Sequence, residues 1–301
     1  MRIRRARRQS AVSGTLLVEQ LLNGVQLGVM LFLMSAGLTL VFGIMNLINL
    51  AHGSLYMAGA FFAATFLKLT GSFVLAVALA VPATAALGTL LEFTILRRFY
   101  ARSHLDQVLV TFGLILVFNE LIRLLFGPVP LPMPLPPQIA GSTNIMPDLA
   151  YPTFRLIILG AGVAVAVGLY LLVNHTRAGM WVRAGASDRA MASALGVDVG
   201  LIFSLVFAVG AALAGLAGIM AGPITAVQVG MGEPILILAL VVTVVGGIGS
   251  IRGAFIAAII IGVADTFGHV LLPPAFGSMV IFILMAAILA WRPQGLFPAH
   301  G

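Results

Sequence analysis

The chain has 301 residues, of which 61% are hydrophobic and 8% charged, and its mean hydropathy is +1.14. A soluble domain carries about 25% charged residues, so this composition excludes a soluble globular enzyme and a disordered chain. A membrane protein with several spans remains, for which the bilayer supplies the apolar solvent. The net charge is +7, and the chain has no cysteine, which excludes disulfides and thiolate chemistry.

Residues 1–15 form a basic tail that holds five arginines within its first eight positions. The rest of the chain is nearly balanced in charge, which argues against a basic face for nucleic acid. A basic cluster before the first apolar run predicts a cytoplasmic N-terminus. A signal-peptide n-region is the alternative, and Glu19, Gln20 and Asn23 weigh against it because they interrupt the apolar run.

Long apolar runs then follow one another along the chain. They cover approximately residues 16–45, 50–69, 72–96, 106–126, 154–174, 198–221, 235–249, 253–272 and 276–291. Most are near the roughly 20 residues of a spanning helix, and they lack the alternation of a β-barrel. We therefore expect an all-α polytopic membrane protein, with one transmembrane domain over residues 16–297.

The arginines predict which loops share a side of the membrane. The basic segments are the tail, 97–102, 177–189, Arg252 and Arg292, and no lysine or arginine occurs in 127–153 or 222–234. If all basic segments are cytoplasmic, an even number of crossings must separate them. This predicts eight spans with both termini in the cytoplasm, or ten if residues 16–69 contain short or re-entrant helices.

Two polar, glycine-containing breaks interrupt the apolar pattern, at 43–54 and 246–253. Unwound backbone at membrane depth needs protein or a watery cavity to satisfy it, and paired breaks are typical of a transporter's pathway. The alternative is hydrogen bonding between helices. The residues that we expect to line or brace a translocation route are Asn46, Asn49, His52, Gly53, Gly247, Gly249 and Ser250.

The loop 127–153 is rich in proline and free of lysine and arginine, so we expect it outside the cell. Alternating prolines favour an extended polyproline II strap, although the loop could be a simple spacer.

The segment 175–197 is expected in the cytoplasm and contains a short helix over 188–195. Ser187 suits its N-cap, Asp188 suits the positive end of its dipole, and Gly196 suits the position after its C-cap. Two turns are unstable alone, so the helix must dock. It can dock on a cytoplasmic partner or on its own membrane domain, and its apolar residues for this are Ala190, Met191, Ala194 and Leu195.

Enzyme chemistry is missing from the sequence. Lys68 is the only lysine and no Walker A motif precedes it, so the chain has no P-loop for ATP hydrolysis. The scattered histidines form no metal-binding pattern. We expect no catalysis, no cofactor and no metal. Two charge pairs within apolar runs, Glu120 with Arg123 and Asp265 with His269, could form a proton relay or structural pairs facing the bundle interior.

Several sequence blocks resemble the permeases of branched-chain amino acid ABC transporters. They occur in family order at residues 37–53, 184–188 with 191–197, 246–251 and 292–297. The resemblance implies a permease subunit of an ABC importer in the bacterial cytoplasmic (inner) membrane, carrying branched-chain or other hydrophobic amino acids. A urea or short-amide permease is an alternative within the class. An autonomous secondary carrier or channel is an alternative outside it.

The resemblance also implies the partners, which are a second related permease, two ABC ATPase subunits, an extracytoplasmic substrate-binding protein and membrane lipid, without nucleic acid. One departure is Arg252, where the family often has proline. The positions that match the family's ATPase-coupling segment are Arg183, Ser187, Asp188, Ala192, Leu195 and Gly196.

Overall fold

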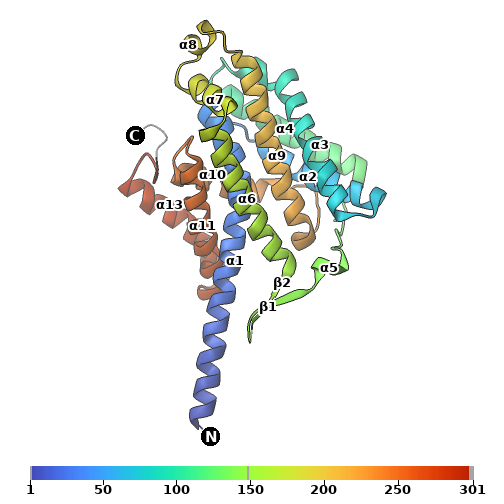
Figure 1. The fold of residues 1–301 in the computed structure, drawn as a ribbon, viewed down its shortest axis with the longest axis vertical. Coiled ribbons are helices and arrows are strands. Elements are labelled where there is room, and N and C mark those ends of the chain that lie inside the picture. Colours follow the sequence, from blue (N-terminus) through green and yellow to red (C-terminus); the bar gives the residue numbers. More distant parts are fainter. Residues whose placement is uncertain (1, 148, 298–301) are drawn as a thin grey trace.

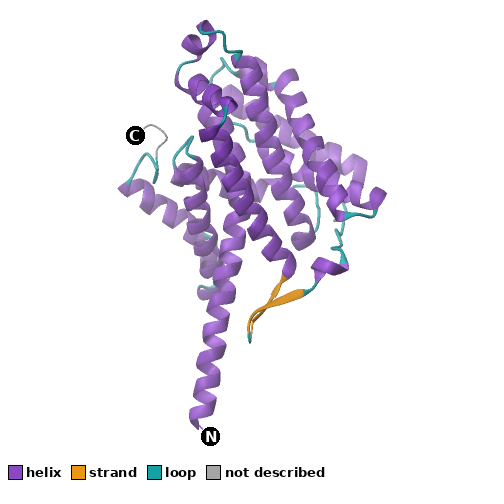
Figure 2. Cartoon of the chain, in the orientation of Figure 1, coloured by secondary structure: helices purple, strands orange, loops and turns teal. Residues whose placement is uncertain are grey.

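The computed structural model describes residues 2–147 and 149–297, and the side chains of 2–13, 274 and 275 lie outside this description, including the arginine cluster of the tail. Figure 2 shows a helical molecule with a single small hairpin of strands. The elements in chain order are α1 (Arg2–Met45), α2 (His52–Thr70), α3 (Phe73–Thr94), the 3-10 helix η1 (Leu96–Phe99), α4 (His104–Phe126), α5 (Pro137–Ala140), β1 (Ser142–Met146), β2 (Leu149–Pro152), α6 (Thr153–His175), α7 (Arg177–Ser187), α8 (Arg189–Ala194), α9 (Val199–Thr225), α10 (Gly232–Gly246), α11 (Ile251–Leu271), α12 (Pro274–Gly277) and α13 (Met279–Trp291).

The expectation of a helical membrane protein is confirmed. Among the described residues, six helices are long and apolar enough to cross a membrane, namely α1, α3, α4, α6, α9 and α11. Two shorter apolar helices, α10 and α13, and the less apolar α2 cover the remaining apolar runs. The structure does not confirm a count of eight spans.

Helix α1 lies at the centre of the bundle, packed against α9, α10 and α11. Glycines let the backbones approach closely, as is usual between membrane helices. A Cβ atom on Gly28 of α1 would lie 2.7 Å from the Ala258 carbonyl oxygen of α11, and one on Gly59 of α2 would lie 2.7 Å from the Gly215 carbonyl oxygen of α9. These contacts leave no room for a side chain, so glycine fixes how close the helices pack.

The bundle has two distinct ends. At one, which we call the α8 end, Arg189 of α8 donates a hydrogen bond to the Met45 carbonyl at the end of α1 (2.8 Å). At the other, the hairpin end, the Tyr151 hydroxyl of β2 donates to the Asn23 side chain of α1 (3.1 Å). Helix α1 therefore connects both ends, and Figure 1 shows its N-terminus projecting beyond the hairpin end.

This geometry differs from the expectation that the basic tail shares a side with 175–197. The physical reason is that α1 is one uninterrupted helix from Arg2 to Met45, so its two ends must lie at opposite ends of the bundle. The other basic segments do gather at the α8 end. Arg97 donates to Ser204 near the start of α9 (2.8 Å), and the segment after Arg292 pairs with the end of α10.

The loop between α4 and α6 is more structured than its prolines predict. Its first part is extended, and Leu131 exchanges two backbone hydrogen bonds with Val227 after α9 (2.8 and 3.0 Å). Its second part forms α5 and the antiparallel pair of β1 and β2. The prolines concentrate in 128–137, so residues 142–146 keep the N–H groups that a ladder needs.

Candidate functional site: the helix breaks and the exposed helix α8

The first break is the non-helical linker of residues 46–51 between α1 and α2. Asn46 ends α1 in a left-handed conformation with φ 51°, which asparagine tolerates better than most residues. Its side chain is exposed at the α8 end, apart from the buried polar residues of the linker. Gln107 of α4 fixes the linker, because its side-chain oxygen accepts a hydrogen bond from the Ile48 N–H (3.1 Å).

Two polar side chains of this break are fully enclosed. Asn49 is 1% exposed and His52 is 0% exposed. In the part of the chain that the structure describes, the Asn49 amide and the His52 ring nitrogens have no hydrogen-bond partner. A buried unpaired polar group costs about 1–3 kcal/mol, and native proteins carry few of them, often where function requires it.

Beyond the linker, two helix N-termini meet inside the bundle. A Cβ atom on Gly53, at the start of α2, would lie 2.7 Å from the carbonyl oxygen of Gly232, at the start of α10. Glu233 lies beside this junction and accepts a short hydrogen bond from Asn119 of α4 (2.6 Å). Helix N-termini carry partial positive charge. The junction therefore combines two positive helix ends with a carboxylate and an amide.

The second break is the turn 247–250 between α10 and α11. Gly247 and Gly249 have φ values of 100° and 81°, which side chains with a Cβ rarely adopt. Ser250 caps α11 by accepting a hydrogen bond from the Gly253 N–H (3.1 Å). The Leu296 N–H donates to the Val245 carbonyl (2.8 Å), so the C-terminal segment covers the end of α10.

Helix α1 brings the two breaks near each other. A Cβ atom on Gly37 would lie 2.9 Å from His52 Nε2, and one on Gly43 would lie 3.1 Å from the Gly249 nitrogen. Six residues of helix separate these glycines, which is roughly 9 Å along the axis. The structure therefore places the two groups of predicted residues on one helix, with the second group nearer the α8 end.

Sequence reasoning missed the carboxylates with the closest partners. Glu92 of α3 is fully buried, and it accepts hydrogen bonds from Ser204 (2.7 Å) and Tyr100 (2.5 Å) and pairs with Arg97 (3.1 Å). Burial raises the pKa of Tyr100 well above its usual range, and the bond to Glu92 adds to this, so its hydroxyl keeps the proton it donates. The sequence did contain one indication of this pair, because Arg97 lies five positions after Glu92.

The two charge pairs expected from sequence both form. Glu120 and Arg123 lie 3.6 Å apart with more than half of each side chain exposed, so this pair faces outward and the expected interior position is wrong. His269 Nδ1 lies 3.3 Å from Asp265 Oδ1, with the carboxylate largely buried. No group of three His, Asp or Glu side chains that could hold a metal occurs within 2–147 and 149–297.

The short helix of segment 175–197 forms as α8, with one correction at its start. Ser187 is the last residue of α7, and Asp188 is the N-cap, because its Oδ1 accepts a hydrogen bond from the Met191 N–H (2.9 Å). Leu195 is the C-cap, and Gly196 follows with φ 85°, as predicted. The cap lies one residue later than expected because Asp188 and Ser187 are both suitable caps.

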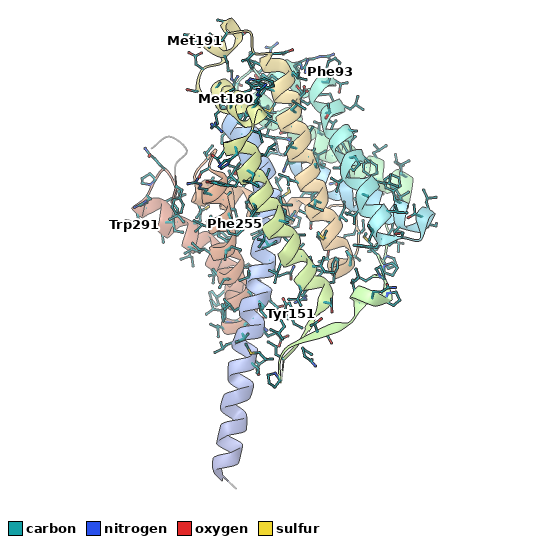
Figure 3. The ribbon with its side chains drawn as sticks, in the orientation of Figure 1. Phe93, Tyr151, Met180, Met191, Phe255 and Trp291 are labelled. Carbon is teal, nitrogen blue, oxygen red and sulfur yellow. The ribbon has the colours of Figure 1, made fainter. Side chains whose placement is uncertain are left out.

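Few side chains attach helix α8 to the bundle, and its other side chains are exposed. Ala192 is buried, and Arg189 bonds to the end of α1 with its guanidinium 4.9 Å over the Phe203 ring. Arg183 of α7 donates to the Val173 carbonyl of α6. Met191 is 59% exposed and Leu195 is 77% exposed, and Ala190 and Ala194 are exposed as well. Figure 3 shows Met191 at the upper extremity of the molecule, beyond the end of the helix bundle. The four apolar residues expected to be buried are thus not buried against this chain.

Comparison with known proteins identifies the family of the chain. A family profile described as the permease component of the branched-chain amino acid transport system matches residues 20–289. The chain belongs to this family. The permease is 30% identical to the high-affinity branched-chain amino acid transport system permease protein BraD of Pseudomonas aeruginosa over 291 residues, covering 93% of this chain and 95% of BraD.

Further relatives carry the name LivH. The permease is 29% identical to the LivH proteins of Salmonella typhimurium and Escherichia coli over 303 residues, covering 93% of this chain and 94% of theirs. The match extends over both helix breaks and over α8, so the breaks and α8 belong to the part of the chain that is shared with these relatives.

Proposed function

We propose that this chain is the membrane-spanning subunit of an ABC importer that moves branched-chain or other hydrophobic amino acids across the cytoplasmic membrane. The family match over residues 20–289 carries this proposal. BraD and LivH are named as permeases of high-affinity branched-chain amino acid transport. The energy would come from separate ATPase subunits, since this sequence has no Walker A motif.

The proposed assembly contains this permease, a second related permease, two ABC ATPases and an extracytoplasmic substrate-binding protein. Helix α8 would receive the ATPase. The support is its exposed apolar surface of Met191 and Leu195 on a helix too short to be stable undocked. Arg183, Ser187, Asp188, Ala192 and Gly196 would hold this surface in place.

The proposed orientation puts the α8 end in the cytoplasm and the hairpin end outside. The basic segments 97–102 and 177–189, with Arg252 and Arg292, would then lie inside, as positive charges usually do. The chain would cross nine times, once for each apolar run, with the C-terminus inside and the N-terminus outside. This replaces the eight crossings inferred from charge, because α1 is a single continuous helix.

The proposed translocation route passes along the junction of α2 and α10. Asn49, His52 and Gly53 from the first break would line or brace it, and Gly247, Gly249 and Ser250 would support its inner end. Asn46 would only cap α1. The unpaired Asn49 and His52 side chains, with the Glu233–Asn119 pair nearby, support this assignment.

Transport by the reconstituted importer tests the function. Proteoliposomes should accumulate labelled leucine only when both permeases, the ATPases, the binding protein and ATP are present. Uptake by this permease alone would instead indicate an autonomous carrier or channel. Preference for urea or acetamide over leucine would indicate the amide-permease alternative.

Single cysteines test the orientation, since the chain has no native cysteine. Ser142→Cys in β1 and Gly14→Cys in α1 should react with a membrane-impermeant maleimide from outside, and Ser187→Cys only after permeabilisation. Labelling of Gly14→Cys from the same side as Ser187→Cys would contradict the nine-crossing topology.

A further inference from the structure

A groove on the flank of the bundle lies away from the junction of α2 and α10. It has a volume of about 810 Å³ and lies between α6 and α11, with Phe32 of α1 at its floor. Figure 1 shows α1 passing between these two helices, and Figure 3 shows Phe255 where they come together. Val163, Val167 and Ile256 on the groove walls are exposed on the outer surface of this chain, so the groove is open to the outside of the bundle.

The end of the groove nearest α8 is positively charged. Arg252 of α11 places its guanidinium 5.0 Å over the Tyr170 ring of α6 and donates a hydrogen bond to the Tyr170 hydroxyl (3.2 Å). Across the described residues, no carboxylate lies within ion-pair distance of Arg252. Asn174 and Ser250 complete this polar end. The charge is thus held in a fixed position by an aromatic ring and is not neutralised by the protein.

The other end of the groove is apolar. Its walls are Val163, Ala166 and Val167 of α6 and Phe255 and Ile256 of α11. From Tyr170 to Val163, α6 rises roughly 10 Å, so in the proposed orientation the groove would extend from headgroup depth into the hydrocarbon. Its volume is in the range of small-molecule sites, well above what one amino-acid side chain needs.

We propose that this groove binds an anionic phospholipid from the leaflet at the α8 end. The headgroup phosphate would receive the Arg252 guanidinium, which is suited to phosphate oxygens, and the Tyr170 hydroxyl. An acyl chain would lie along the apolar walls over Phe32. Basic pockets between membrane helices on the cytoplasmic side are known to take anionic headgroups.

The position of the charge favours lipid over other occupants. No carboxylate lines the groove to pair with the ammonium group of a transported amino acid, whereas Arg252 offers positive charge. A protein partner would need an Asp or Glu side chain placed opposite Arg252, whereas every anionic phospholipid carries a phosphate. The groove shares Gly249 and Ser250 with the inner end of the proposed route, whereas none of its apolar walls belongs to the junction of α2 and α10.

Binding of a defined lipid to the full-length permease tests the proposal. The delipidated protein in detergent is titrated with dioleoyl phosphatidylglycerol, and bound lipid is counted by native mass spectrometry, with dioleoyl phosphatidylcholine as the neutral probe. Arg252→Gln should weaken phosphatidylglycerol binding about fivefold, the effect of one basic residue near a membrane surface, and should weaken phosphatidylcholine binding less, because choline already neutralises its phosphate.

Two further variants make the result specific. Arg292→Gln is the matched control, because Arg292 also lies at the α8 end with its guanidinium 5.0 Å over a ring, Trp291, and does not line the groove. It should retain phosphatidylglycerol. Val167→Trp should fill the apolar half of the groove and displace the lipid without changing charge.

The proposal is overturned if Arg252→Gln and Arg292→Gln bind phosphatidylglycerol equally. It is also overturned if glycerol phosphate competes as well as the intact lipid, which would indicate a simple anion site. Displacement of the lipid by the second permease subunit would assign the groove to a protein interface instead.

Discussion

The centre of the bundle and helix α8 use the same kinds of residue in opposite ways. In the centre, glycines and small residues bring backbones together, and α1 is enclosed by α9, α10 and α11. In α8, the apolar Met191 and Leu195 project away from the chain, and Ala192 is the buried residue of the helix. The contrast shows that apolar character alone does not say what a surface packs against. The central helix surfaces are buried by other helices of this chain, whereas the apolar surface of α8 would need a second chain to bury it.

The largest expected effect comes from the centre. Gly59→Val would place a branched side chain against the Gly215 carbonyl of α9, and overpacking a close helix contact costs about 1–3 kcal/mol or more. We expect a strong loss of monodisperse permease in size-exclusion chromatography. Gly160→Val is the control, because open space surrounds Gly160 of α6. Equal yields of the two variants would show that the close approach of α2 and α9 is not essential.

The exposed surface of α8 should respond in the opposite way. Leu195→Asp should leave the permease folded, because that side chain contacts little of its own chain. Docking of the ATPase should weaken more than tenfold, since burying a leucine contributes about 1.5–3 kcal/mol. Co-purification of the ATPase measures this. Leu69→Asp, a matched control because Leu69 near the C-terminal end of α2 is 75% exposed, should co-purify normally. Normal ATPase recovery with Leu195→Asp would show that α8 is not part of the interface.

A smaller effect is expected where α8 ends. Gly196 has φ 85°, so Gly196→Val should cost on the order of 1 kcal/mol locally and reduce substrate-stimulated ATP hydrolysis while the permease stays in the membrane. Gly196→Asn should retain most activity, because asparagine tolerates the left-handed conformation. If the asparagine variant is as impaired as the valine variant, the backbone conformation is not the cause.

The smallest effect is expected at the N-cap of α8. Asp188→Ala removes the acceptor for the Met191 N–H and should destabilise the helix by about 1 kcal/mol. Coupled ATP turnover in proteoliposomes should fall a few-fold. Asp188→Asn keeps a capping oxygen and should behave like the parent. A defect in Asp188→Asn as large as that of Asp188→Ala would indicate a role for the charge itself.

The features that depend on local sequence could be predicted. The breaks near His52 and Gly249, the short helix after Asp188 and the left-handed Gly196 all follow from residue types at fixed spacing. They were found because helix ends are determined by a few neighbouring residues.

The features that depend on distant partners could not be predicted. Glu233 pairs with Asn119, 114 positions away, and Glu92 with Ser204, 112 positions away, and no spacing rule links such residues. The position of the N-terminus at the opposite end of the bundle from α8 also could not be predicted. A topology drawn from charge alone treats the basic tail like the basic loops. The composition did not show that α1 continues as one helix through residues 2–45.

The short final helix has a consequence for the surrounding membrane. Helix α13 has 13 residues, so it is roughly 20 Å long, about 10 Å less than the hydrocarbon core of a typical bilayer. Phe282 and Ile283 lie on its exposed side, and Trp291 with Arg292 at its end suits an interfacial anchor. If α13 crosses the bilayer as proposed, the lipids along this flank must be shorter to match it. The hydrophobic mismatch would then thin the bilayer beside α13 and favour shorter acyl chains there.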